Sequence, residues 1–196
     1  MWLLTPLCRK FNIMKKIKAI LIPGNGGGTP QDAWFPYLER ELPKLGIEVI
    51  NKQFPDSVLA RQEYWLPFIK ELGADENAIL IGHSSGAVAA MRFAETNKIL
   101  GSVLVGASYT DLDLESERVS GYFDRPWKWQ SINNNQKWII EFASIDDPFI
   151  PIEEARHIHK NLNTEYYEYK DQGHFGDSAH AKLEFPELVD LIKQKL

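Results

Sequence analysis

Apolar and polar positions along the chain form two alternating kinds of segment. Short, mostly apolar segments predict β-strands at 17–22, 47–51, 78–81, 100–105, 138–142 and 164–169. Apolar residues at helical spacing predict helices at 34–44, 60–72, 87–96, 153–162 and 185–195. Strands that are apolar on both faces and alternate with helices are typical of a parallel sheet covered on both sides. The sequence therefore predicts an α/β fold with a mostly parallel sheet of about six strands and helices on both faces.

One long segment, 108–135, shows neither the strand period nor the helix period. It contains four aromatic residues, Tyr122, Phe123, Trp127 and Trp129. Irregular connections of such length inside a compact domain are commonly lids or binding segments. We therefore expect these aromatic side chains to form a substrate lid. The alternative is that they cap one end of the hydrophobic core.

The composition is that of a single globular domain. Hydrophobic residues make up 44% and charged residues 25% of the 196 residues, which excludes wholesale disorder. Lys and Arg number 22 against 27 Asp and Glu, and the net charge of −5 argues against a nucleic-acid-binding protein. The single cysteine, Cys8, excludes an internal disulfide, and no apolar run is long enough to span a membrane. We expect a cytoplasmic protein without membrane or nucleic-acid partners.

The first 16 residues form a separate segment, in which a short apolar run at 2–7 precedes several basic residues. A secretory signal has its positive charge before a longer apolar run. We interpret 1–16 as a loosely ordered extension, or as the result of a start codon upstream of a true start at Met14. An organelle transit peptide is the alternative interpretation. The predicted domain then comprises 17–196.

The sequence Gly-His-Ser-Ser-Gly at 82–86 is the strongest chemical signal in the chain. It fits the pattern G-x-S-x-G and lies between a predicted strand and a predicted helix, where this motif forms a sharp turn that exposes the serine hydroxyl. The glycines are needed because strand and helix approach closely there. The motif predicts Ser84 as a nucleophile. The backbone N–H of Ser85, at the start of the following helix, is a predicted donor to the oxyanion.

A serine hydroxyl needs a base that takes its proton and an acid that orients the base. In proteins with this turn the chain order is Ser, then Asp or Glu, then His. His174 follows the sixth predicted strand and is the candidate base, with His180 as its rival. Asp147 follows the fifth predicted strand and is the candidate acid. Its neighbour Asp146 is expected to point to the opposite side and to cap the turn or the next helix.

The segment Pro-Gly-Asn-Gly-Gly-Gly at 23–28 follows the first predicted strand. It matches neither the dinucleotide-binding spacing of glycines nor the phosphate-binding loop, which carries a lysine. We interpret it as a second source of oxyanion-stabilising N–H groups, from Asn25 or Gly26; a plain flexible turn is the alternative. His157 and His159 would lie on different faces of a helix, so no metal site and no cofactor are predicted.

The chain resembles the small serine hydrolase family that includes retinoblastoma-binding protein 9 and its bacterial relatives. The resemblance extends from about residue 18 to the C-terminus and rests on the segments 22–28, 64–68, 81–95, 120–127, 146–149 and 173–175. It implies a compact α/β-hydrolase fold and a triad of Ser84, Asp147 and His174, the same residues that the motifs indicate.

One departure from the family concerns a protein partner. The mammalian member carries an L-x-C-x-E segment associated with binding to the retinoblastoma protein. The corresponding segment here is 72–76, where Ala74 replaces the cysteine. The resemblance therefore does not extend retinoblastoma-protein binding to this chain.

Together these observations predict a serine hydrolase that cleaves small ester or amide substrates through an acyl-enzyme intermediate. The alternative is an interaction module that has the same fold but no turnover. The chemically intact set of Ser84, Asp147 and His174 favours the enzyme. The expected partner is a small acyl substrate.

Overall fold

A computed structural model describes residues 16–176 and 181–196, and within them the chain forms one six-stranded sheet. The strands are β1 (Lys18–Ile22), β2 (Glu48–Asn51), β3 (Ala78–His83), β4 (Gly101–Val105), β5 (Ile139–Ser144) and β6 (Glu165–Tyr169). Their order is β2-β1-β3-β4-β5-β6, and every neighbouring pair is parallel. The predicted α/β fold is thus confirmed. The predicted N-terminal extension lies almost entirely outside the described residues.

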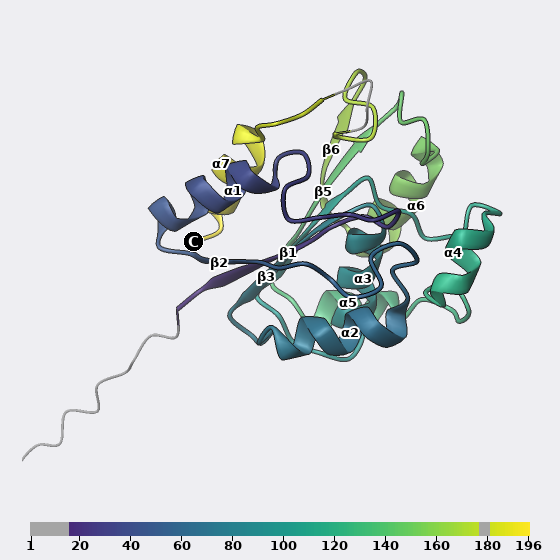
Figure 1. The fold of residues 1–196 in the computed structure, drawn as a ribbon, viewed down its shortest axis with the longest axis horizontal. Coiled ribbons are helices and arrows are strands. Elements are labelled where there is room, and N and C mark those ends of the chain that lie inside the picture. Colours follow the sequence, from purple (N-terminus) through teal and green to yellow (C-terminus); the bar gives the residue numbers. More distant parts are fainter. Residues whose placement is uncertain (1–15, 177–180) are drawn as a thin grey trace, which may run out of the picture.

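Helices cover both faces of this sheet (Figure 1). They are α1 (Phe35–Glu41), α2 (Gln62–Glu71), α3 (Ser85–Ala94), α4 (Glu115–Ser120), α5 (Trp129–Asn134), α6 (Ile152–Leu162) and α7 (Pro186–Gln194), with a short 3₁₀ turn at Leu42–Leu45. Helices α1 and α7 lie together on one face, and α2, α3, α5 and α6 pack on the other. No helix in the described part of the chain has both the length and the apolar character needed to cross a membrane.

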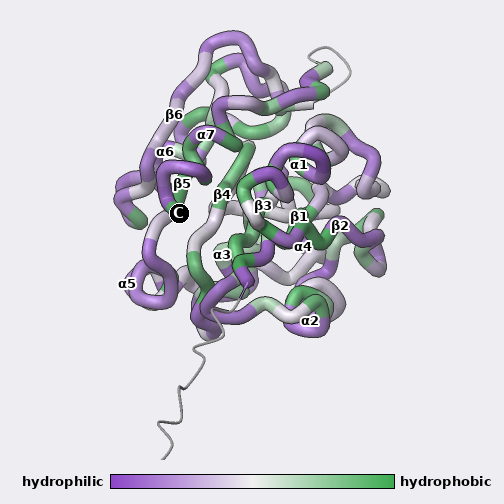
Figure 2. The backbone as a smooth tube through the Cα atoms, turned by 90° about the vertical axis from the view of Figure 1, so that its left-hand side faces the viewer, coloured by the Kyte–Doolittle hydropathy of each residue, from purple (hydrophilic) through white to green (hydrophobic). Residues whose placement is uncertain are grey.

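Alternate residues of each central strand enter two separate hydrophobic cores. In β1, Ile20 and Ile22 pack beneath α2 and α3, whereas Ala19 and Leu21 pack beneath α1 and α7. All four side chains are fully buried. Figure 2 shows the consequence, since the central strands are the most hydrophobic parts of the trace. This double burial explains why the strand sequences are nearly continuous apolar runs rather than alternating ones.

The segment 108–135 is more regular than its sequence suggests, because it contains α4 and α5. Each of these helices has six residues, which is too short for a helical period to emerge from the pattern. The prediction of an irregular connection is therefore wrong in this respect. The segment begins after β4, so that α4 lies near the edge of the sheet at which the parallel strands end (Figure 1).

Four connections leave that same edge and bring separated residues together. The strand β1 leads into the glycine-rich segment, β3 into Ser84, β5 into Asp147 and β6 into His174. Ligands of open parallel sheets bind outside the carboxyl ends of the strands. The topology therefore assembles the predicted site residues before any side-chain contact is considered.

Candidate active site

Ser84 occupies a strained turn between β3 and α3. Its backbone angles are φ 55° and ψ −123°, a conformation that L-residues rarely adopt. Its N–H donates to the carbonyl of Val105 at 2.8 Å, and its own carbonyl accepts from Ala87 at 2.9 Å. A Cβ atom at Gly82 would collide with the backbone of Gly86. The two glycines of the motif are therefore a requirement of the turn.

His174 and Asp147, the candidate base and acid, form a close pair. The Nδ1 atom of His174 lies 2.7 Å from Oδ2 of Asp147, and only 10% and 3% of the two side chains are exposed. The second carboxylate oxygen of Asp147 accepts the N–H groups of Phe149 and Ile150 at 2.9 and 3.0 Å. These two bonds fix the plane of the carboxylate. A proton on Nδ1 is thereby favoured, which leaves the Nε2 lone pair for accepting a proton.

The adjacent aspartate has a different role. Asp146 Oδ1 accepts the hydroxyl of Ser144 at 2.5 Å and the N–H of Gly173 at 3.0 Å. Asp146 thus braces the segment that precedes His174, whereas Nδ1 of the imidazole lies on the carboxylate of Asp147. The rival base His180 lies outside the described residues. The ring of His157, on α6, stacks on the ring of Tyr109, with the two ring centroids 3.8 Å apart.

The glycine-rich segment 23–28 passes close to Ser84. Of its two predicted oxyanion donors, the backbone N–H groups of Asn25 and Gly26, one already donates a hydrogen bond within the protein. The N–H of Gly26 donates to the carbonyl of Val58 at 3.0 Å, so the structure corrects the prediction that this group contacts an oxyanion. No hydrogen bond between described residues uses the N–H of Asn25 or that of Ser85. A Cβ placed on Gly24 would lie 3.3 Å from Cβ of Ser84, which shows how closely the segment passes this serine. Asn25 and Ser85 remain as candidate donors.

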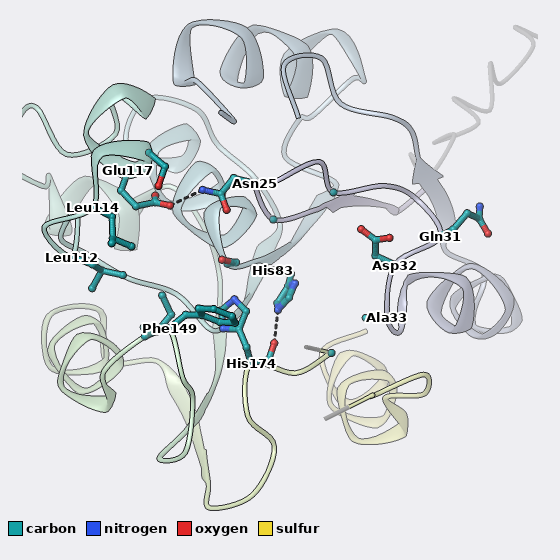
Figure 3. A pocket seen from close by; sticks show the side chains of 16 residues that line it. Asn25, Gln31, Asp32, Ala33, His83, Leu112, Leu114, Glu117, Phe149 and His174 are labelled. Carbon is teal, nitrogen blue, oxygen red and sulfur yellow. Dashed lines mark hydrogen bonds between the residues drawn. The ribbon is translucent and has the colours of Figure 1, made fainter. Parts of the chain in front are cut away.

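A single hydrogen bond joins this segment to α4. The Asn25 side chain donates through Nδ2 to Oε1 of Glu117 at 2.6 Å (Figure 3). Burial raises the pKa of Glu117, and the bond from Asn25 acts in the opposite direction. The bond orders the side chain of the residue whose backbone N–H is the candidate oxyanion donor. Glu117 is not recognisable from the sequence pattern.

These groups surround a cavity of about 570 Å³ (Figure 3). Ser84, His174, Asn25 and Glu117 line it, together with an apolar wall made of Leu112, Leu114, Phe149 and Ile150. Phe149 is 58% exposed and Leu114 48% exposed, so both present apolar surface to whatever occupies the cavity. Among the described residues, no cluster of His, Cys, Asp or Glu side chains is arranged to hold a metal ion.

The structure does not place the four aromatic residues of the predicted lid around this cavity. Tyr122 is fully buried, and Phe123, Trp127 and Trp129 pack against the core beneath α2 and α3; none of the four lines the cavity. The guanidinium of Arg92 lies 3.5 Å from the ring centre of Trp127. The segment 108–135 does reach the cavity, but through Leu112, Leu114 and Glu117. The packing of the aromatic residues favours the alternative interpretation, in which they cap one end of the core.

The leucines were missed because nothing in their sequence context distinguishes them. Leu112 and Asp113 have φ values of 53° and 58°, and this backbone conformation turns the chain toward the cavity. Such angles are not encoded in a pattern of apolar residues. Phe149 had a weak signal, since it lies two positions after the candidate acid.

A serine on a strand-to-helix turn, beside a histidine–aspartate pair at the carboxyl edge of a parallel sheet, defines the α/β-hydrolase class. The family model described as serine hydrolase matches residues 19–194. The chain is also 43% identical over 182 residues to the serine hydrolase RBBP9 of Rattus norvegicus, which covers 91% of this chain and 95% of that protein. This chain belongs to the serine hydrolase family.

More distant similarities concern the fold. The structure of the ydeN gene product of Bacillus subtilis superposes with a TM-score of 0.80 at 23% identity, covering 91% of this chain and 98% of that chain. The structure of Est1E from Butyrivibrio proteoclasticus with bound ferulic acid has a TM-score of 0.69 at 15% identity, covering 94% and 90%. Both share the α/β-hydrolase architecture with this chain.

Trp127 tests whether the aromatic residues are core caps. Its indole donates to the carbonyl of Tyr109 at 2.8 Å and stacks on Trp129. We expect Trp127→Ala to lower the free energy of unfolding by about 2–4 kcal/mol, somewhat below the range for a fully buried aromatic. The ranking of kcat/KM among acetyl, butyryl and hexanoyl esters should stay as in the wild type. Lys128→Ala, a change at an exposed neighbour, is the control. A stable Trp127→Ala variant with an altered ranking would restore the lid hypothesis.

Proposed function

We propose that this protein hydrolyses small ester or amide substrates through a covalent acyl intermediate on Ser84. The hydroxyl oxygen of Ser84 attacks the substrate carbonyl carbon while His174 Nε2 takes the hydroxyl proton. The tetrahedral intermediate then expels the alcohol or amine, to which His174 returns the proton. A water molecule attacks the acyl-enzyme by the same route and releases the carboxylic acid. The scheme uses no cofactor.

The observation that carries this proposal is the 2.7 Å contact between His174 and Asp147 beside the turn that presents Ser84. An orienting carboxylate holds the imidazole in the tautomer that can accept a proton on Nε2, and it stabilises the imidazolium that forms. Because Asp147 is itself held by two backbone N–H groups, it resists rotation away from the histidine.

Backbone N–H groups are also available to stabilise the negative charge that develops on the substrate oxygen. Ser85 is the first residue of α3, where backbone N–H groups lack helical partners and the helix dipole favours negative charge. The N–H of Asn25 would supply the second donor from the opposite side. Loss of one such donor typically costs about 10²–10³-fold in turnover.

The cavity supports a substrate with a small apolar acyl group. Its volume of about 570 Å³ is in the range of small-molecule sites. Leu112, Leu114 and Phe149 offer apolar contact area on one wall. Est1E, which shares the fold, binds the small aromatic acid ferulic acid, and an acyl group of similar character would suit this wall.

Fluorophosphonate labelling tests the nucleophile. We expect the wild-type protein to be labelled on Ser84, and Ser84→Ala to abolish both labelling and ester hydrolysis, because the attacking oxygen is removed. Ser85→Ala is the matched control, since it makes the same change one residue away and retains the backbone N–H. Labelling that survives Ser84→Ala and is lost in Ser85→Ala would refute the assignment.

The two aspartates provide an internal comparison. Asp147→Asn should reduce kcat by about 10⁴-fold, because an amide favours the wrong tautomer of the histidine. Asp146→Asn should have a much smaller effect, since Oδ1 of Asp146 accepts hydrogen bonds from Ser144 and Gly173, whereas Nδ1 of His174 lies on Asp147. Steady-state kinetics of both variants, with circular dichroism to verify folding, make the comparison. Equal losses would contradict the assignment of Asp147.

Leu114 tests the acyl-binding wall. Removing its side chain should lower kcat/KM for hexanoyl esters by about 5–10-fold relative to acetyl esters, since about 1 kcal/mol of apolar contact is lost. Val119→Ala is the control, because Val119 is exposed on α4, the helix that follows Leu114, and does not line the cavity. If Leu114→Ala lowers kcat/KM equally for both esters, the acyl group does not contact this wall.

A further inference from the structure

The loop that carries His174 has an energetically unfavourable backbone conformation. Gly173, Phe175 and Gly176 have φ values of 49°, 56° and 135°. Phe175 is not a glycine, and a left-handed conformation costs such a residue about 1–2 kcal/mol. A side chain at Gly176 would meet Cβ of Ala33 as well. A loop of this kind keeps one conformation only when its surroundings determine it.

Two side chains donate hydrogen bonds to consecutive carbonyls of this loop. His83 lies with Nε2 at 2.7 Å from the carbonyl oxygen of His174 (Figure 3). The indole N–H of Trp34 donates to the carbonyl of Phe175 at 3.0 Å. The two donor rings contact each other edge to face, with centroids 6.0 Å apart. They come from the end of β3 and from the residue before α1, so two separate elements hold the loop.

The charge state of His83 suits this contact. A carbonyl accepts but does not donate, so the proton of the neutral imidazole lies on Nε2. Burial and the nearby His174 lower the pKa of His83 to about 3; Asp147 and Asp32 also face it and act in the opposite direction. His83 is therefore neutral at physiological pH. Its ring centroid is 4.7 Å from that of His174, and a neutral ring there does not repel the imidazolium that catalysis requires.

We propose that His83 and Trp34 are positioning residues for His174, and this inference rests on the proposed function. His83 immediately precedes the nucleophile Ser84, so its bond ties the backbone of the base directly to the turn that carries the nucleophile. Trp34 holds the next carbonyl and prevents rotation of the same peptide segment. Together they keep Nδ1 of His174 on Asp147 and direct Nε2 toward Ser84. Neither residue contacts the reacting atoms in this scheme.

Two substitutions at His83 separate its hydrogen bond from its volume. His83→Leu removes the donor, whereas the amide nitrogen of His83→Gln can reach the same carbonyl. We expect His83→Leu to lower kcat by about 10–100-fold, because misplacement of a catalytic group by about 1 Å costs up to 10²-fold. KM should stay within about twofold, and the rate of fluorophosphonate labelling should fall with kcat. His83→Gln should recover most of both rates. Trp34→Phe, which removes only the second donor, should lower kcat in the same direction.

The pH profile distinguishes positioning from a merely structural role. In His83→Leu the contact between His174 and Asp147 is less firmly held, so the imidazolium loses stabilisation and the apparent pKa in kcat/KM should fall. Melting temperatures and active-site titration give the folded fraction. A variant that is only less stable, with the wild-type kcat and apparent pKa per folded molecule, would overturn the inference. So would a His83→Gln variant as slow as His83→Leu.

The same labelling experiment separates this inference from the proposed function. If Ser84→Ala abolishes labelling while His83→Leu is labelled at the wild-type rate, only the role of His83 is refuted. If Ser84→Ala is still labelled, the proposed function itself fails.

Discussion

The close approach of three backbone segments at the turn around Ser84 is the constraint on which the rest of the site depends. A Cβ atom at Gly82 would collide with Gly86, and one at Gly86 would collide with the carbonyl oxygen of Ile22. With no side chain at these two positions, β1, β3 and α3 meet. Ser84 is then forced into a left-handed conformation that lifts its hydroxyl above the edge of the sheet. The same contact brings the glycine-rich segment after β1 beside the serine.

The remaining groups are added to this turn by contacts of different kinds. Asp147 is fixed by backbone N–H groups that follow it in its own loop, whereas His174 is held by side chains from distant elements. Gly106 allows the imidazole to pass, since a Cβ there would lie 3.0 Å from Cε1 of His174. The position of His174 therefore depends on packing, and that of Asp147 depends mainly on local backbone geometry. This difference explains why a residue at the end of β3 and the residue before α1 contribute to the arrangement of a loop after β6.

The sequence predicted the positions of site residues that the sheet topology determines. It did not predict positions that depend on contacts between segments far apart in the chain. Ser84, Asp147 and His174 each follow a strand, and parallel strands end at one edge, so their convergence was predictable. The hydrogen bond from the N–H of Gly26 to the carbonyl of Val58 was not predictable, because the two residues lie in separate loops. The aromatic residues of 108–135 were misassigned for a similar reason, since buried Arg92 on α3 draws them onto the core. Helices as short as α4 leave no periodic signal.

The proposed function requires a covalent bond between the substrate acyl group and Ser84. The most direct measurement is to quench the reaction with an activated ester, such as a p-nitrophenyl ester, within the first turnover and to map the mass increase by peptide mass spectrometry. We expect an acyl group on the peptide that contains Ser84, with the modification at that residue. The adduct should disappear at a rate no slower than steady-state turnover. An adduct on another residue, or full turnover without any adduct on Ser84, would contradict the proposed function.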